Sequence, residues 1–142
     1  MQTADRFRAA VEDRDLAAMA GLFAPDVRFF SPVKFTPFEG RPMVEALMGV
    51  LLRTFEDFRY VGQLQGEAEM GEDGVQTESH LLIFRATVGG KRIHGVDLLQ
   101  LDDQGLIKEF TVMVRPLSAV TALSDAVLAG LVADGLVPAP GS

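Results

Sequence analysis

The sequence predicts a single α+β domain, in which helices cover one face of a curved antiparallel β-sheet. Three observations support this fold class. The chain has 142 residues, which suits one domain. Apolar residues follow a helical spacing over most of residues 3–55, whereas residues 58–115 form strand-like runs separated by turn signals. Helices that are segregated from a run of antiparallel strands are typical of α+β domains.

Two helices and a short strand are predicted first. Thr3 can cap the first helix, and Asp13 or Asp15 would break the chain and cap the second. Pro25 would end the second helix, and residues 27–31 predict a strand because they are β-branched and aromatic. The apolar positions of the two helices are Phe7, Ala10 and Val11, then Leu16, Met19, Leu22 and Phe23.

An apolar loop and a third helix follow. Residues 31–40 contain two prolines and two phenylalanines, which favours a loop of unusually apolar composition. Pro42 fits the first turn of the third helix. The apolar stripe of this helix consists of Val44, Leu47, Met48, Leu51, Leu52 and Phe55.

Long strands and a final helix complete the domain. Pro116 would stop the last strand, and Ser118 would cap the final helix. The domain is expected to span residues 1–137, with residues 138–142 as a flexible tail. Strands are predicted over residues 58–70, with an interruption at Gly62 or Gly66, and over 75–88, 91–101 and 106–115. The turns between them fall at Asp73-Gly74, Gly89-Gly90 and residues 102–105.

Asp97 is the most informative residue in these strands. A carboxylate within an apolar strand is costly to bury as an ion, so the protein must pair it, hydrate it or keep it protonated. A two-residue turn at Gly89-Gly90 would set Leu82 opposite Asp97 and His80 opposite Leu99. His80 is then diagonal to Asp97, at roughly 7–8 Å between backbones. We therefore predict Asp97 and His80 as a catalytic acid–base pair on the inner face.

The inner face of the sheet is predicted to line a small-molecule pocket. Gly95 beside Asp97 would leave room for a ligand against the backbone. The sequence does not fix the face of the last strand: either Phe110, Val112 and Val114 or the alternating set Thr111, Met113 and Arg115 point inwards. The expected ligand-binding residues are Leu82, Phe84, Ile93, Gly95, Leu99, Phe110, Val112, Phe30 and Tyr60.

The opposite face of the same hairpin is also apolar. His94, on this face, is expected to point outwards rather than into the pocket. An apolar outer sheet face suggests a homodimer interface. The residues of this face are Ser79, Leu81, Ile83 and Arg85 on one strand and His94, Val96, Leu98 and Gln100 on the next.

Composition excludes several kinds of function. The chain has no cysteine, so it has no disulfide, thiolate nucleophile or thiolate metal site, and its two histidines make a metal site unexpected. The net charge of −7 argues against a nucleic-acid partner. The N-terminal residues lack the apolar segment of a signal peptide, and no stretch is long and apolar enough to span a membrane. We therefore expect a cytoplasmic protein with no membrane partner and no cofactor.

The order and spacing of three segments resemble the NTF2-like superfamily, in particular its SnoaL-like and ketosteroid-isomerase-like branches. The segments are DLAAMAGLFAPDVRFF, FEGRP at the start of a helix, and HGVDLLQLDDQGLIKEF. The resemblance covers nearly the whole chain. It implies a cone formed by a curved sheet with helices packed on its concave face, an internal pocket, and usually a dimer.

The resemblance carries over to the site residues only in part. Asp97 matches the strand aspartate that ketosteroid isomerases use as a protonated hydrogen-bond donor to an oxyanion, which is an established example of an acid kept neutral by an apolar site. The general-base aspartate of those enzymes falls where this chain has Ser31, and their oxyanion tyrosine falls where it has Phe7. Steroid isomerisation by that mechanism is therefore not expected.

Three functions fit these observations. The first is a cofactor-free isomerase, cyclase or hydrolase that acts on a small apolar molecule through acid–base chemistry at Asp97, with help from His80. The second is a module that binds or senses such a molecule without catalysis, as the missing base and tyrosine would suggest. The third is a dimeric interaction domain that uses the outer sheet face. The sequence does not identify the substrate and leaves open whether the protein is an enzyme.

Overall fold

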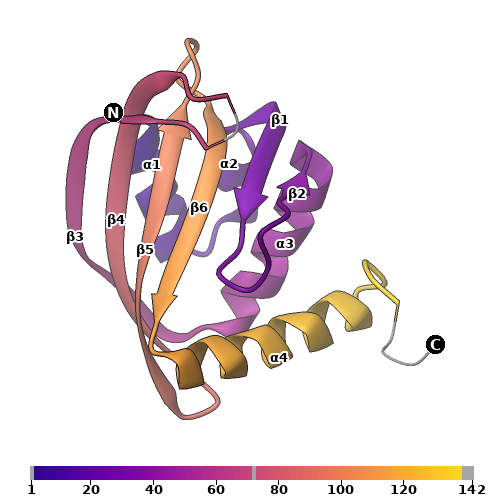
Figure 1. Cartoon of the computed structure of the whole chain (residues 1–142). Helices are drawn as coiled ribbons and strands as arrows, with labels where there is room; N and C mark the ends of the chain where they lie inside the picture. The colour runs from indigo at the N-terminus through magenta and orange to yellow at the C-terminus, as the bar shows by residue number, and fades with distance from the viewer. Residues whose placement is uncertain (1, 72, 139–142) are drawn as a thin grey trace.

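The computed structural model describes residues 2–71 and 73–138. This part of the chain folds into four helices and one curved sheet of six strands (Figure 1). The helices are α1 (Thr3–Glu12), α2 (Leu16–Ala20), α3 (Arg41–Thr54) and α4 (Leu117–Ala133). The strands are β1 (Phe23–Phe30), β2 (Phe38–Glu39), β3 (Glu56–Glu69), β4 (Gln76–Val88), β5 (Lys91–Leu101) and β6 (Ile107–Arg115).

The sheet is mixed rather than wholly antiparallel. Its strand order is β2-β1-β6-β5-β4-β3, and β3 to β6 pair antiparallel through successive hairpins. Strand β1 pairs parallel with β6, which departs from the antiparallel sheet predicted above. Parallel neighbours need a long connection between them, here everything from β2 to β5, so no local turn signal reveals the pairing.

The helices lie against one face of the sheet, which we call the inner face. Helices α1, α2 and α3 cover this face, and α4 runs across the end of the sheet where β6 finishes (Figure 1). The core lies between the inner face and these helices, and its largest wholly buried side chains include Phe7, Phe23, Phe84 and Phe110. None of the helices within the described residues is long and apolar enough to cross a membrane.

Several helix ends differ from the sequence-based prediction. The hydroxyl of Thr3 does not cap α1 but donates to the carbonyl of Gly105. Asp15 does cap α2, because its carboxylate accepts the backbone N–H of Ala18 at 3.1 Å. Ser118 lies within the first turn of α4, which begins after Pro116 without a side-chain cap. The prediction that Asp15 restarts the helix is therefore confirmed, and the caps at Thr3 and Ser118 are wrong.

The strands follow the predicted pattern more closely. β1 begins earlier than expected, so Pro25 lies inside the strand rather than at a helix end. Strand β3 shifts register between Tyr60 and Gly62, as predicted for an interruption at Gly62. The Gly89-Gly90 turn gives the predicted pairing of Leu82 with Asp97. On β6, Val112 pairs with Asp97, so Phe110 and Val112 face inwards.

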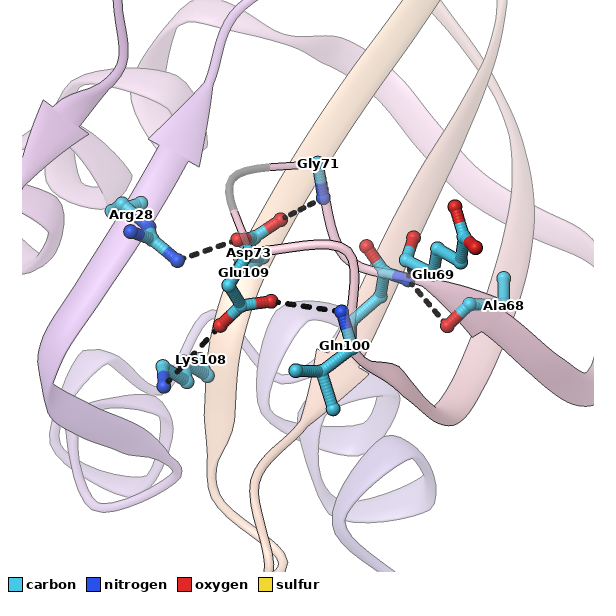
Figure 2. Close-up of polar contacts among 9 residues, drawn as sticks. Arg28, Ala68, Glu69, Gly71, Asp73, Gln100, Lys108 and Glu109 are labelled. Atoms are coloured by element: carbon cyan, nitrogen blue, oxygen red, sulfur yellow. Dashed lines mark hydrogen bonds and ion pairs between the residues drawn. The ribbon is translucent and has the colours of Figure 1, made fainter.

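A polar cluster on the opposite, outer face fixes the end of the β3–β4 hairpin. Glu109 on β6 is 1% exposed, and its carboxylate accepts hydrogen bonds from Arg28 Nη2 at 2.6 Å and from the Gly71 backbone N–H at 2.9 Å. The side-chain amide of Gln100 donates to the carbonyl of Glu69 at 3.1 Å. Figure 2 shows these contacts bringing the hairpin end over the sheet. The cluster therefore buries one carboxylate together with a cation.

Candidate functional site

A cavity of about 440 Å³ lies between the inner face and the helices. Small-molecule sites typically occupy roughly 300–1,000 Å³. Most of the lining is apolar and comes from elements distant in the sequence: α3, α4, the start of β3, and strands β1 and β6. The principal apolar lining residues are Phe29, Phe38, Leu47, Met48, Leu51, Leu52, Phe55, Phe58, Phe110, Val112, Leu123, Val127 and Leu131.

Few polar side chains reach this cavity. Asp97 and Tyr60 contribute from the sheet, and the others come from α1 and the segment after it, the loop after β1, and α4. Ser31 also lines the cavity, but its hydroxyl oxygen accepts the backbone N–H groups of Val33 and Lys34, each at 3.2 Å. The polar lining residues are Glu12, Arg14, Ser31, Lys34, Tyr60, Asp97 and Ser124.

Asp97 and Tyr60 form a hydrogen-bonded pair in the cavity wall. The Tyr60 hydroxyl donates to Asp97 Oδ2 at 2.7 Å, and the two residues are only 6% and 5% exposed, respectively. Burial raises the pKa of Asp97 from its ordinary value of 3.8 to about 7, while the hydrogen bond from Tyr60 acts in the opposite direction. Burial also raises the pKa of Tyr60 well above 10, and the nearby Asp97 charge adds to this rise. Asp97 therefore holds a proton over most of the acidic range.

The protonation state of Asp97 decides what the pair can offer a ligand. When Asp97 is protonated, the pair has two hydroxyl hydrogens, and the contact between the two residues uses only one. The second hydrogen is then available to a ligand oxygen in the cavity. When Asp97 is ionised, the one remaining hydrogen lies between the two residues. Protonation thus converts the pair into a hydrogen-bond donor.

The structure does not bring His80 to Asp97. The predicted backbone register is confirmed, since His80 pairs with Leu99 and is diagonal to Asp97. However, Nε2 of His80 lies 2.7 Å from Glu78 Oε2, and Nδ1 is buried without a partner among the described residues. The cavity lining includes Asp97 but not His80. His94 is exposed on the outer face, as expected.

Only some of the predicted ligand-binding residues line the cavity. Tyr60, Phe110 and Val112 do so. Leu82, Ile93 and Leu99 are wholly buried in the core and leave no surface for a ligand. Gly95, Phe84 and Phe30 also lie outside the cavity lining.

Gly95, Phe84 and Phe30 are excluded for local reasons. The ring of Phe84 already occupies the space beside Gly95, so a Cβ added to Gly95 would overlap it. Phe84 itself is 1% exposed and stacks on Phe58, which lines the cavity in its place. In β1 it is Phe29 that faces inwards, and its neighbour Phe30 points to the other side.

Sequence reasoning missed two features of the site. It did not link Tyr60 to Asp97, because the two lie on strands separated by β4. It also did not place Glu12, or the inner side of α4, at the cavity.

Among the residues that the structure describes, no group of three or more histidine, aspartate or glutamate side chains could hold a metal ion.

Known proteins resemble this chain in both sequence and fold. The family model for the SnoaL-like domain matches residues 4–110. A steroid delta-isomerase from Pseudomonas aeruginosa has 34% identity and a TM-score of 0.82, covering 95% of this chain and 93% of the other. A protein with a cystatin-like fold from Silicibacter pomeroyi has the same identity and TM-score, over 94% and 87% of the two chains.

A more distant structure shows the fold alone. It is an NTF2-like protein of unknown function from Cytophaga hutchinsonii, with 21% identity and a TM-score of 0.55 over 80% of this chain and 88% of the other. None of the curated proteins matches. The family match spans most of the chain, and the curved sheet with its helices is the NTF2-like cone. This chain therefore belongs to the SnoaL-like family, in the ketosteroid-isomerase-like branch of the NTF2-like superfamily.

Proposed function

We propose that this protein is a cofactor-independent enzyme that acts on a small apolar carbonyl compound. In this proposal the Asp97–Tyr60 pair donates a hydrogen bond to an oxygen that becomes negatively charged during the reaction. Isomerisation is the reaction that the similarity to the Pseudomonas aeruginosa steroid delta-isomerase favours, with cyclisation and hydrolysis as related uses of the same pair. The observation that carries the proposal is a buried acid, in an apolar cavity, whose one side-chain hydrogen-bond partner among the described residues is a hydroxyl group.

The apolar surroundings would make this hydrogen bond effective. A donor fixed in a site of low dielectric constant stabilises a developing oxyanion more than the same donor would in water. Phe58 packs edge-on against Tyr60 at 5.0 Å between ring centres, which holds the tyrosine in place. A carbonyl oxygen at the pair would therefore meet a preorganised donor, and the donor would bind the enolate more tightly than the ketone.

Tyr60 supplies a hydroxyl that the Phe7 position does not. Phe7 packs edge-on against Phe110 at 5.3 Å in the core and has no polar atom to offer. Tyr60 reaches Asp97 from β3 instead. The proposed donor pair thus uses a tyrosine from a different element than the family resemblance implies.

The proposal is tested by conversion of a β,γ-unsaturated ketosteroid to its conjugated isomer, which absorbs in the ultraviolet. Asp97→Leu should lower kcat by about 10²–10³-fold, as expected when one oxyanion donor is removed. Asp97→Asn should be less impaired, because the amide can still accept from Tyr60 and donate to the ligand. Asp73→Asn, in the outer hairpin, is the matched control. Equal turnover by the wild type and Asp97→Leu would contradict the proposal.

A module that binds a small molecule without catalysis is the second candidate. It is favoured by Ser31, whose hydroxyl occupies the position of the expected base and is engaged by two backbone N–H groups. This candidate predicts saturable binding of the ketosteroid, measured by calorimetry, with no conversion. It also predicts that Asp97→Asn changes the Kd by only a few-fold.

We also propose that the protein forms a homodimer through the outer sheet face. Leu64 and Met113 on this face are 59% and 50% exposed, and Val96 and Leu98 between them are half-buried. Met113→Lys should shift the protein to a monomer in sedimentation experiments. Leu117→Lys, which alters an exposed apolar residue on α4, is the control. A monomeric wild-type protein would contradict the dimer.

A further inference from the structure

A second carboxylate lies at the cavity, on a different element from Asp97. Glu12 is the last residue of α1, and among the described lining residues only Glu12 and Asp97 carry a carboxylate. The Glu12 side chain is 48% exposed, and its Oε2 lies 3.6 Å from Nε of Arg8. Glu12 therefore has solvent and a cation beside it, whereas Asp97 is 5% exposed and has no cation beside it within the part of the chain that the structure describes.

Arg8 contacts both Glu12 and Tyr60, two of the residues that line the cavity. Arg8, the ion-pair partner of Glu12, lies over the Tyr60 ring with its guanidinium carbon 5.7 Å from the ring centre. The charge on Glu12 also contributes to the raised pKa of Tyr60, after burial and Asp97. Glu12 and Tyr60 line the same cavity and share Arg8 as a neighbour, so a ligand that touches the Tyr60 hydroxyl would occupy the cavity that Glu12 also lines.

The other polar groups of the cavity cannot readily accept a proton from carbon. Arg14 and Lys34 are cations, and Arg14 donates to the carbonyl of Leu52 at 2.8 Å. Ser31 already accepts two backbone N–H groups. No histidine is among the described lining residues. Glu12 is therefore the remaining group that combines a negative charge with access to the cavity.

We propose that Glu12 is the general base of the reaction, removing a proton from the carbon next to the substrate carbonyl. The electron pair of the C–H bond becomes the C=C bond of an enolate, and the negative charge moves to the oxygen held by Asp97 and Tyr60. Glu12 keeps the proton and returns it to the γ-carbon, which gives the conjugated ketone. No oxidant or other reactant is needed. The substrate class is an apolar ketone with an acidic C–H bond, and the inference rests on the function proposed above.

The two carboxylates have the environments that such a division of roles requires. A reaction of this type needs one group that holds a proton and another that is ionised at the same pH, and proteins achieve this by giving two acids different surroundings. Asp97 is buried with no cation beside it among the described residues, and burial raises its pKa to about 7, whereas the Glu12 side chain is half-exposed and lies beside Arg8. The structure thus provides a base on α1 in place of the one missing at Ser31.

The test uses a β,γ-unsaturated ketosteroid that carries deuterium at the α-carbon. Glu12→Gln should lower the rate of isomerisation and of deuterium loss by about 10²-fold or more, as expected when a general base is removed. A phenol, which resembles the enolate, should bind Glu12→Gln within a few-fold of the wild type. Asp13→Asn alters the neighbouring carboxylate, which does not line the cavity, and should behave as the wild type.

A rescue experiment separates a base from a structural residue. Glu12→Ala should regain part of its activity when formate is added, because a small carboxylate can enter the space left by the side chain. If isomerisation survives in Glu12→Gln but is lost in Asp97→Leu, the role of Glu12 as the base is overturned, while the proposed function of the Asp97–Tyr60 pair stands. A wild-type protein that binds the ketosteroid but neither converts it nor exchanges its deuterium would overturn the proposed function, and this inference with it.

Discussion

Two carboxylates are buried on neighbouring strands of the same sheet, and their surroundings differ. Glu109, on the outer face of β6, receives hydrogen bonds from Arg28 and from the Gly71 backbone (Figure 2). Asp97, on the inner face of β5, receives one from the Tyr60 hydroxyl. Both are nearly inaccessible, at 1% and 5% exposed, so burial alone does not distinguish them. The difference is a neighbouring cation: Glu109 has Arg28, and no cation lies beside Asp97 in residues 2–71 and 73–138.

The contrast separates a structural acid from a candidate functional one. The Glu109 charge is compensated, and its contacts join β1, β6 and the hairpin end. The charge on Asp97 would be uncompensated, so the residue holds a proton and faces an apolar cavity. A buried acid therefore indicates a site when its partners leave a proton available to a ligand.

The largest expected effect is on the outer face. Arg28→Met leaves the Glu109 carboxylate buried without its cation, which should lower the free energy of unfolding by about 3–5 kcal/mol. Urea denaturation at neutral pH measures the change. Arg53→Met, at the exposed ion pair with Asp134, is the control and should cost less than about 1 kcal/mol. Equal effects from both variants would show that Arg28 does not compensate a buried charge.

Asp97→Asn should raise the free energy of unfolding, the opposite of the effect of Arg28→Met. Between pH 4 and pH 7 the folded protein keeps a proton on Asp97 that the unfolded chain has released, so the free energy of unfolding of the wild type falls as the pH rises through this range. Asparagine removes this penalty. Its stabilising effect should be about 3 kcal/mol larger at pH 8 than at pH 5, from roughly 1.4 kcal/mol per pKa unit. Urea denaturation at the two pH values gives the comparison, and a difference independent of pH would contradict it.

A smaller effect is expected where packing shapes the cavity. Gly95→Ala would push the ring of Phe84 against Phe58 and Phe55, whose ring centres lie 4.8 and 5.7 Å from it. Overpacking of this kind costs about 1–3 kcal/mol. Because Phe58 and Phe55 line the cavity, binding of the ketosteroid should also weaken, as measured by calorimetry. Gly66→Ala, which has open space around it, should change neither quantity by a comparable amount.

The smallest change in stability should follow Tyr60→Phe. The variant removes the hydroxyl that donates to Asp97, at a cost of about 1 kcal/mol near pH 6. That hydrogen bond lowers the pKa of Asp97, so its loss should raise the pKa above that of the wild type. NMR titration of the Asp97 carboxyl group reports this directly. An unchanged pKa would mean that Tyr60 does not stabilise the ionised form.

The register that places Asp97 on the inner face could be predicted from the sequence. A Gly89-Gly90 turn fixes the pairing of β4 with β5, and this pairing is confirmed. The parallel pairing of β1 with β6 could not be predicted in the same way, because it joins segments far apart in the chain. Phe30 was predicted to bind the ligand, but it is the neighbouring Phe29 that lines the cavity, and the composition of this short strand does not fix which of the two faces inwards.

The partners of Asp97 could be predicted less well than its position. A diagonal register brings two backbones close, but the side chain of His80 turns to Glu78. The true neighbour, Tyr60, is reached across β4 through a strand whose register shifts between Tyr60 and Gly62. A bulge of this kind changes which side chains share a face. The position of Glu12 at the cavity depends on how α1 packs against the sheet, and no local sequence pattern specifies that packing. Of the predicted tail, residues 139–142 lie outside the described residues.

The most direct test of the central claim is the pKa of Asp97 itself. A carboxyl-carbon NMR titration, with Asp97→Asn to assign the signal, would measure it in the unliganded protein. The structure predicts a value near 7, because burial without a cation favours the protonated acid. A value at or below the ordinary 3.8 would contradict the account. It would mean that Asp97 is ionised at neutral pH and that the pair has no hydrogen to donate to a ligand.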